Sequence, residues 1–300
     1  EAAGHRPCRV AAAGPAVGTA PLPLAACTPA APRLPCAVLS ARKCPVVQLS
    51  EQCVLITGGA RGLGLHLSQA FAREGAQVII NYHRSAQAAQ SLADQLGPQR
   101  AIALQADVTD PAQVQAMLAS AAGHFGRPPT TVVNNALAAF SFNGDARPKA
   151  DAIGWEAFQG QLEGSVRGAL STVQAALPAM RAQRFGRVIN IGTNLFQNPV
   201  VPYHDYTAAK AALLALTRTL AGDLGPDGIT VNMLSGGLLR STDASAATPE
   251  AVFDYIAANT PLRSVTTPAE FADAALFFAS PWARAVTGQN LVVDGSLVRD

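Results

Sequence analysis

The chain has 300 residues, which is long enough for one large α/β domain with a sizeable core. Its net charge is only +2 and it shows no basic patch with interleaved aromatic residues, so nucleic acid is not the expected partner. No apolar run reaches the roughly 18 residues that a membrane-spanning helix needs. The cysteines form no Cys-x-x-Cys pair and the histidines show no metal-ligand spacing, so we expect no metal site.

Residues 1–47 differ in composition from the rest of the chain. Nearly half of them are alanine or proline, and the recurring prolines interrupt helices and strands alike. We therefore predict a disordered extension at residues 1–47 and a single folded domain at residues 48–300. Because the chain starts at Glu1 rather than Met, we expect a fragment or a processed chain. The extension carries arginines but few acidic residues, so import into an organelle stays open beside a cytoplasmic location.

The folded domain begins with a strand, a glycine turn and a helix. Cys53–Thr57 is a short apolar run, typical of a buried parallel strand, and a helical pattern covers Leu65–Glu74. Between them, glycines stand at positions 58, 59, 62 and 64. Glycines let a backbone approach a pyrophosphate closely, and a helix N-terminus offers free N–H groups. This context predicts a dinucleotide-binding loop with the spacing Thr-Gly-x-x-x-Gly-x-Gly.

The second expected strand, Ala76–Asn81, ends without an acidic residue. An Asp or Glu at this place usually holds the ribose 2′-hydroxyl of NAD. Here the chain continues with Tyr82, His83 and Arg84. Arg84 and Arg61 are both suited to a 2′-phosphate, because arginine binds phosphate oxygens well. We therefore predict NADP, with a solvated loop charge as the alternative role of Arg84.

The next elements alternate between helix and strand. A helix is expected at Gln87–Leu96 and a strand at Arg100–Gln105. Asp107 follows that strand, and it either accepts a hydrogen bond from the adenine amino group or caps a turn. The helix Pro111–Phe125 has Asp110 as its expected N-cap and a proline at its first position.

A third strand end carries polar residues toward the same edge of the sheet. The strand Thr131–Val133 is followed by Asn134, Asn135 and Ala136. Ligands bind at the carboxyl edge in open α/β sheets, so we expect these residues near the dinucleotide. A long helix is expected at Trp155–Gln183.

Tyr206 and Lys210 stand four positions apart at the start of an alanine- and leucine-rich helical run, Ala208–Leu224. Residues four apart lie on the same face of a helix, which puts a phenol beside an ammonium group. That neighbour is expected to lower the pKa of the phenol well below its usual value near 10. A phenol tuned in this way can exchange a proton with a carbonyl or an alcohol near neutral pH.

These motifs occur together and in an order typical of one family. They are accompanied by Gly186–Ile191, Ile229–Asn232 and the ending Thr287–Gly295. Over roughly residues 50–298 the chain resembles the short-chain dehydrogenase/reductase family, particularly its 3-oxoacyl-(acyl-carrier-protein) reductase-like members of fatty acid biosynthesis. The resemblance implies an α/β fold: a Rossmann-type doubly wound parallel sheet of about seven strands with helices on both faces, a three-layer sandwich.

The resemblance also implies roles for individual residues. Tyr206 is the expected general acid, and Lys210 is expected to lower its pKa and to bind the nicotinamide ribose. Thr193 stands where the family has a serine that donates a hydrogen bond to the developing oxyanion, a bond a threonine hydroxyl can also make. The expected contacts of the NADP(H) cofactor, besides Tyr206 and Lys210, are Gly58, Arg61, Gly62, Leu63, Gly64, Arg84, Asp107, Val108, Asn134, Asn135, Ala136 and Gly236.

The chain departs from the family pattern in three further places. Ser165 stands where many members carry an asparagine that orders a water in the proton relay, so the relay is expected to use a different water or to be weakened. Leu137 replaces a glycine after Ala136 and is expected to crowd the cofactor. Gly237 adds a glycine after Gly236, in a loop that contacts the nicotinamide end in the family.

Substrate specificity is expected in two apolar segments, Leu195–Tyr203 and Leu238–Leu262. The second contains a helical stretch, Val252–Ala258, for which Thr248 is the expected N-cap, and such a segment commonly serves as a lid. The leading hypothesis is an NADPH-dependent reductase of a carbonyl, with a 3-oxoacyl thioester as the expected substrate. An NADP-linked alcohol or sugar dehydrogenase and a catalytically weak nucleotide-binding regulator stay open. A homotetramer or dimer is expected from the resemblance.

Overall fold

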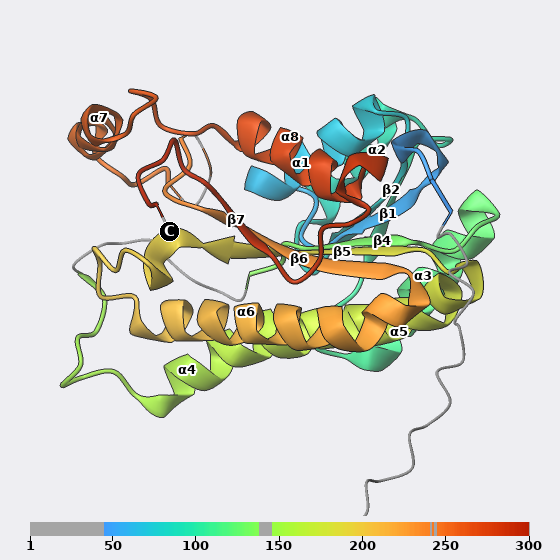
Figure 1. Ribbon diagram of the computed structural model, residues 1–300, viewed down its shortest axis with the longest axis horizontal. Coiled ribbons are helices and arrows are strands. Elements are labelled where there is room, and N and C mark those ends of the chain that lie inside the picture. Colours follow the sequence, from blue (N-terminus) through green and yellow to red (C-terminus); the bar gives the residue numbers. More distant parts are fainter. Residues whose placement is uncertain (1–44, 138–145, 241, 243–244, 300) are drawn as a thin grey trace, which may run out of the picture. The chain divides into compact units, whose positions relative to one another are not determined.

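The computed structural model describes residues 45–137, 146–240, 242 and 245–299. These residues belong to the compact unit Cys44–Asp300. Seven strands among them form one parallel sheet in the order β3-β2-β1-β4-β5-β6-β7, with helices on both faces (Figure 1). The doubly wound parallel sheet expected from the sequence is thereby confirmed. The expected disordered extension falls almost wholly on residues 1–44, which lie outside the described residues.

Strands and helices alternate along most of the chain. The strands are β1 (Cys53–Ile56), β2 (Gln77–Tyr82), β3 (Ala101–Gln105), β4 (Thr131–Asn134), β5 (Gly186–Thr193), β6 (Ile229–Gly236) and β7 (Asn290–Val293). The helices are α1 (Gly62–Arg73), α2 (Ala86–Leu96), α3 (Pro111–Phe125), α4 (Trp155–Leu162), α5 (Gly168–Gln183), α6 (His204–Leu224), α7 (Glu250–Asn259) and α8 (Pro268–Ala279). In the part of the chain that the structure describes, no helix is both long and apolar enough to cross a membrane.

The sheet separates two apolar cores, because successive side chains of a strand point to opposite faces. In β1, Val54 and Ile56 pack with α1 and α8, whereas Cys53 and Leu55 pack with α3 and α5. All four residues are fully buried, which explains why β1 is apolar throughout rather than alternating. Figure 1 shows α1, α2 and α8 on one face and α3, α5 and α6 on the other.

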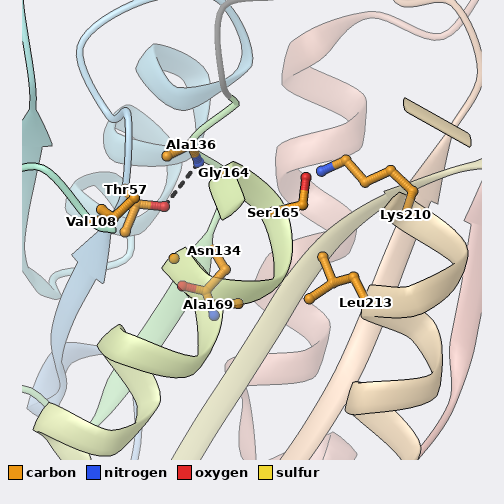
Figure 2. Close-up of a pocket in the computed structure, with 10 residues that line it drawn as sticks. Thr57, Val108, Asn134, Ala136, Gly164, Ser165, Ala169, Lys210 and Leu213 are labelled. Carbon is orange, nitrogen blue, oxygen red and sulfur yellow. Dashed lines mark hydrogen bonds between the residues drawn. The ribbon is translucent and has the colours of Figure 1, made fainter. Parts of the chain in front are cut away.

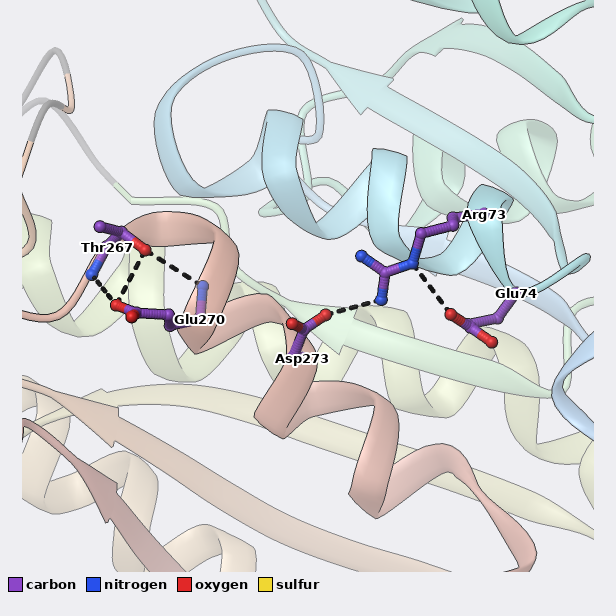
Figure 3. A network of polar contacts seen from close by, with 5 residues as sticks. All are labelled: Arg73, Glu74, Thr267, Glu270 and Asp273. Carbon is purple, nitrogen blue, oxygen red and sulfur yellow. Dashed lines mark hydrogen bonds and ion pairs between the residues drawn. The ribbon is translucent and has the colours of Figure 1, made fainter.

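Polar contacts tie α1 to α8 at the surface (Figure 3). The Arg73 guanidinium donates to Asp273 at 2.7 Å, across the two helices. Thr267 and Glu270 form a capping box at the start of α8, in which each side chain accepts from the other's backbone N–H at 2.8 and 3.3 Å. The Arg73–Asp273 pair ties α8 to the helix that follows the glycine loop, and the capping box closes the start of α8.

The long helix expected at Trp155–Gln183 is interrupted. A π-helical turn, Glu163–Arg167, separates α4 from α5. Single π-turns widen a helix locally and are frequent at functional sites. Close packing accompanies the turn, since a Cβ on Gly168 would lie 2.9 Å from Val108 Cγ2. The turn brings Ser165 into the interior, where its side chain is buried.

Two expectations about helix starts have different outcomes. Asp110 caps α3 as expected, since its side chain accepts from Ala112 N at 2.9 Å and Gln113 N at 3.3 Å. The expectation that Thr248 caps the next-to-last helix is wrong, because Pro249 is the N-cap of α7. The ψ angle of Pro249 is 144°, which keeps this residue extended, so the helix begins one residue later.

Candidate functional site

The glycine loop between β1 and α1 has backbone angles and close contacts that disfavour a side chain at its glycine positions. Gly58 and Gly62 have positive φ angles of 61° and 53°, a region that favours glycine. A Cβ on Gly64 would lie 2.1 Å from the carbonyl oxygen of Gly58. No described atom lies within 4 Å of a Cβ built on Gly62, so the space beside the helix N-terminus is open. The first N–H groups of a helix have no partner within the helix, so this open space is a cradle that fits a dinucleotide pyrophosphate.

The end of β4 braces this loop. Thr57 Oγ1 accepts from the backbone N–H groups of Asn135 and Ala136, both at 2.9 Å. The Asn135 side chain donates to the carbonyl oxygen of Thr57 at 2.9 Å. The glycine loop and the residues after β4 are therefore one unit, and the side-chain amide of Asn135 holds the loop in place.

Asn81 is a second brace of the glycine loop, although its uncharged side chain gave no such indication in the sequence. Its Oδ1 accepts from Gly58 N at 3.2 Å, and its Nδ2 donates to Ala106 O at 3.0 Å. Gly59 N also donates to the Asn81 carbonyl at 2.9 Å. The amide links the ends of β2 and β3 to the glycine loop, a task that needs both a donor and an acceptor. The signal available in the sequence was an amide at the end of an apolar strand.

The remaining residues expected on the nucleotide side lie around this loop. Arg61 is the N-cap of α1, and Arg84 is exposed in the turn after β2. Leu63 packs on the core beneath α1. Asp107 accepts from Thr109 N at 2.9 Å and Thr109 Oγ1 at 2.7 Å, and these hydrogen bonds lower its pKa. The turn-capping role is thus present for Asp107, and its contact with adenine stays a prediction.

Tyr206 and Thr193 meet where β5 ends and α6 begins. Their side chains are hydrogen-bonded to one another, and both residues are buried. Thr193 Oγ1 also accepts from Leu195 N at 3.3 Å. That contact takes an acceptor site of the Thr193 oxygen and leaves its hydroxyl hydrogen to be donated. Gly236 pairs with Thr193 in the sheet, so it lies beside this pair.

Lys210 lies one helical turn below Tyr206 but does not act on the phenol as expected. Its amine donates to the carbonyl oxygen of Ile191 at 2.8 Å and stands 5.8 Å from the centre of the Tyr206 ring. Burial lowers the pKa of Lys210 to about 8 and raises the pKa of Tyr206 to about 12, although the hydrogen bond with Thr193 opposes the second change. The expectation of a lowered phenol pKa is therefore wrong for the chain alone, because desolvation outweighs the hydrogen bond with Thr193.

A small cavity of about 10 Å³ joins the two parts of the site. Ser165, Lys210, Thr57 and Ala136 are among the residues that line it, together with Val108 and Asn134 (Figure 2). Among the described residues, none is hydrogen-bonded to the buried Ser165 hydroxyl. The hydroxyl of Ser165 and the amine of Lys210 point toward the same part of the cavity (Figure 2). The volume is close to the minimum that one water needs.

A buried polar network behind the site was not anticipated from the sequence. Asn134 donates to Asn190 at 2.9 Å and accepts from Thr172 at 2.6 Å, and Asn190 donates to Thr217 at 2.9 Å. The network joins β4, β5, α5 and α6, so it fixes α6 against the sheet. The side chain of Asn134 is used within this network, and its expected contact with the cofactor stays a prediction. Only tertiary packing brings these residues together.

The glycine after Gly236, Gly237, is closely packed. A Cβ on Gly237 would lie 3.0 Å from Asn194 Nδ2 and 3.4 Å from Asp294 Cβ. A side chain here would require these neighbours to shift by a few tenths of an ångström. Asn194 also donates to Asp294 at 2.9 Å, which ties the residue after Thr193 to the end of β7. Leu137 is 38% exposed at the other side of the site, and its contact with a cofactor stays a prediction.

Fold and site together define a class of protein: a nicotinamide-dinucleotide-type α/β domain with a phenol, a hydroxyl and an amine gathered at the carboxyl edge of the sheet. Residues 58–297 match the family model described as enoyl-(acyl carrier protein) reductase. The chain belongs to the short-chain dehydrogenase/reductase family of oxidoreductases, which use a nicotinamide cofactor on carbonyl or alcohol substrates. In the described residues, no group of three or more His, Cys, Asp or Glu could hold a metal ion.

Similar proteins act on different substrates. The chain is 32% identical to a 3alpha-hydroxysteroid dehydrogenase of Mediterraneibacter gnavus, over 83% of this chain and 98% of that protein. It is 29% identical to a 3-oxoacyl-(acyl-carrier-protein) reductase of Staphylococcus aureus, over 81% of this chain and 96% of that protein. The crystal structure of a 3-oxoacyl-(acyl-carrier protein) reductase from Brucella melitensis matches with a TM-score of 0.76 and 30% identity, over 84% and 94% of the two chains.

Proposed function

We propose that this chain is an NADPH-dependent reductase that converts a carbonyl group to an alcohol, with a 3-oxoacyl thioester as its substrate. One observation carries the proposal: the Tyr206 hydroxyl is hydrogen-bonded to Thr193 at the carboxyl edge of the sheet, and Lys210 lies beside it. The two 3-oxoacyl reductases among the relatives support the substrate class.

Each side chain has a task in this reaction. A nicotinamide cofactor held at the glycine loop would supply the hydride for the carbonyl carbon. Thr193 donates a hydrogen bond to the carbonyl oxygen, which gains negative charge as the reaction proceeds. Tyr206 gives its proton to the same oxygen, which completes the alcohol. The pKa of about 12 found for Tyr206 keeps the phenol protonated at neutral pH, so the proton is present when it is needed.

The cavity beside Lys210 supports a route for returning that proton. A water there would accept from or donate to the Ser165 hydroxyl and the Lys210 amine, both of which line the cavity. The pKa of about 8 for Lys210 lets its amine gain or lose a proton near neutral pH. Ser165 thus takes over the position that the resemblance gives to an asparagine.

The preference for NADP rests on the nucleotide side of the site. Asn81 replaces the acidic residue expected for NAD, and its side chain is engaged with the glycine loop. Arg84 and Arg61 are exposed beside that loop and are suited to a 2′-phosphate. We further propose a dimer or tetramer in solution, as the resemblance to the family implies.

A spectrophotometric assay tests the proposal. Purified chain with NADPH and acetoacetyl thioester should oxidise NADPH, and Tyr206→Phe should lower kcat by about 10²- to 10⁴-fold with NADPH binding retained. The phenylalanine keeps the ring and removes only the hydroxyl, so a loss of kcat cannot be due to lost packing of the ring. Undiminished turnover in Tyr206→Phe would contradict the assignment.

A second substrate class is favoured by one comparison. The 32% identical relative is a 3alpha-hydroxysteroid dehydrogenase, so a hydroxysteroid oxidised with NADP is the alternative. Two exposed apolar side chains on the expected substrate segments, Val200 and Leu262, suit either an acyl chain or a steroid. The same assay run with a 3-oxosteroid and with a 3-hydroxysteroid plus NADP separates the two, since kcat/KM ranks the substrates directly.

A further inference from the structure

A buried ion pair stands at the start of the helix that carries Tyr206. Arg147 lies in the segment between β4 and α4, and Asp205 is the second residue of α6. The Arg147 Nη2 atom is 2.7 and 2.5 Å from the two carboxylate oxygens of Asp205. The two side chains are 15% and 3% exposed.

This pair differs from the others that the described residues form. Each of the other ion pairs has at least one side chain that is more than half exposed. Exposed pairs are screened by solvent and hold geometry weakly. A buried pair is different, because removing one partner leaves a charge without compensation in a place that water does not reach. Arg147 and Asp205 therefore hold their two segments in one relative position.

The first turn of α6 is not closed by a side-chain cap at its N-terminus. The N-cap residue of α6 is Tyr203, and its side chain makes no capping hydrogen bond. Helix ends without such a cap fray readily. The guanidinium group of Arg147 is 6.0 Å from the centre of the Tyr203 ring and also binds Asp205. One side chain from 58 positions earlier thus contacts the helix on both sides of His204.

We propose that Arg147 and Asp205 are positioning residues for Tyr206. Their ion pair fixes the first turn of α6, and Tyr206 directly follows Asp205. The turn sets the direction of the phenol, and hence its hydrogen bond with Thr193 and its approach to a carbonyl oxygen. The inference rests on the proposed reductase function, in which Tyr206 gives the proton. Small displacements at a reacting group have large effects on rate, so loosening this turn should reduce turnover more than binding.

The test separates positioning from a general loss of stability. Asp205→Asn keeps the shape of the side chain and removes its charge, and Arg147→Lys keeps a charge and loses the planar group. Both are measured for kcat, for KM of acetoacetyl thioester, for NADPH affinity by fluorescence, and for melting temperature. We expect Asp205→Asn to lower kcat about 10- to 100-fold and Arg147→Lys to lower it less, with NADPH affinity unchanged.

The Tyr206→Phe background adds a readout that a merely structural role would not move. If Asp205 acts through the phenol, Asp205→Asn should leave the residual kcat of Tyr206→Phe unchanged. The matched control is the exposed pair Arg181–Asp227, whose atoms are 2.8 Å apart at the opposite edge of the sheet, near the start of β6. Asp227→Asn should leave kcat within about twofold of the unaltered chain.

Several results would overturn the inference. An unchanged kcat in folded Asp205→Asn would do so, as would a melting-temperature loss with no change in kcat. An equal loss of kcat in the Tyr206→Phe background would show an effect that bypasses the phenol. Should Asp205→Asn fail to fold, Arg147→Lys carries the test alone, and an unchanged kcat there overturns it. Full activity of Tyr206→Phe would instead defeat the proposed function, which is a distinguishable failure.

Discussion

The nucleotide side and the catalytic side of the site are built by different means. On the nucleotide side, backbone shape decides: Gly58 and Gly62 adopt positive φ angles, and Gly64 has no room for a Cβ. On the catalytic side, side chains from separate elements decide: Thr193 ends β5, Tyr206 lies in the first turn of α6, and Ser165 lies in a π-turn. The nucleotide side is therefore formed by residues that are neighbours in the sequence. The catalytic side depends on how distant parts of the chain pack.

The largest effect is expected from Gly64→Val, which breaks the backbone-built side. A Cβ at this position would lie 2.1 Å from Gly58 O and 2.9 Å from Asn135 Nδ2, closer than any real contact. The loop must move, and we expect NADPH binding to be lost in a fluorescence titration.

The matched control is Gly222→Ala on α6, because no described atom lies within 4 Å of its built Cβ. Alanine there should retain NADPH binding and raise stability by about 0.5–1 kcal/mol, since glycine is a poor residue within a helix. Retained binding in Gly64→Val would show that the loop adapts and that the cradle is less constrained than its geometry indicates.

The comparison explains which parts could be predicted from the sequence. The strand, the glycine turn and Asp110 with its helix α3 are local patterns, and each lies at or within a few residues of its expected bounds. The π-turn could not be foreseen, because a 3.6-residue pattern continues through it and only packing against Val108 accompanies the break. The network that joins Asn134 to Asn190 and Thr217 is likewise tertiary.

The titration behaviour of the catalytic residues shows the same limit. Helical spacing correctly predicted that Lys210 lies near Tyr206. Spacing carries no information on burial, and burial raises the pKa of the phenol to about 12. Nor could it show that the Lys210 amine donates to Ile191 O. A neighbour is a local property, whereas a pKa depends on the whole surroundings.

The next largest effect is expected from Thr193→Val on the side-chain-built side. Valine has nearly the shape of threonine but no hydroxyl, so the hydrogen bonds to Tyr206 and to the carbonyl oxygen are lost. Removing one such donor lowers kcat by about 10²- to 10³-fold in comparable sites. Steady-state kinetics with NADPH check this, and Thr193→Ser is the control that should stay active. Equal activity of the valine and serine variants would contradict a role for the hydroxyl.

A smaller effect concerns stability rather than rate, and it comes from burying the Lys210 amine. The pKa of Lys210 is about 8 in the folded chain, below its ordinary value of 10.5. Between these two values the unfolded chain binds more protons, so stability rises with pH. Relative to Lys210→Met, the free energy of unfolding should rise by roughly 2–3 kcal/mol from pH 7 to pH 10. Urea unfolding without cofactor at several pH values measures this.

The comparison with Lys210→Met also removes the contribution of the phenol. Tyr206 has a folded pKa of about 12 against an ordinary value of 10.0, so its unfolded form loses the proton first and stability falls from pH 10 to pH 12. Both chains contain Tyr206, and the difference between them isolates the amine. Parallel curves from pH 7 to pH 10 would mean that the amine is hydrated rather than buried.

The smallest effect is expected from Arg84→Ala, which tests the nucleotide side where a side chain rather than the backbone would act. Arg84 is exposed in the turn after β2, so its contact with a 2′-phosphate is screened by solvent. We expect the Kd of NADPH to rise about tenfold, equivalent to about 1.4 kcal/mol, while that of NADH stays unchanged. Titrations at low and high salt measure both. A native preference for NADH, or equal weakening of both cofactors, would show that the backbone cradle alone sets the affinity and that Arg84 does not read the phosphate.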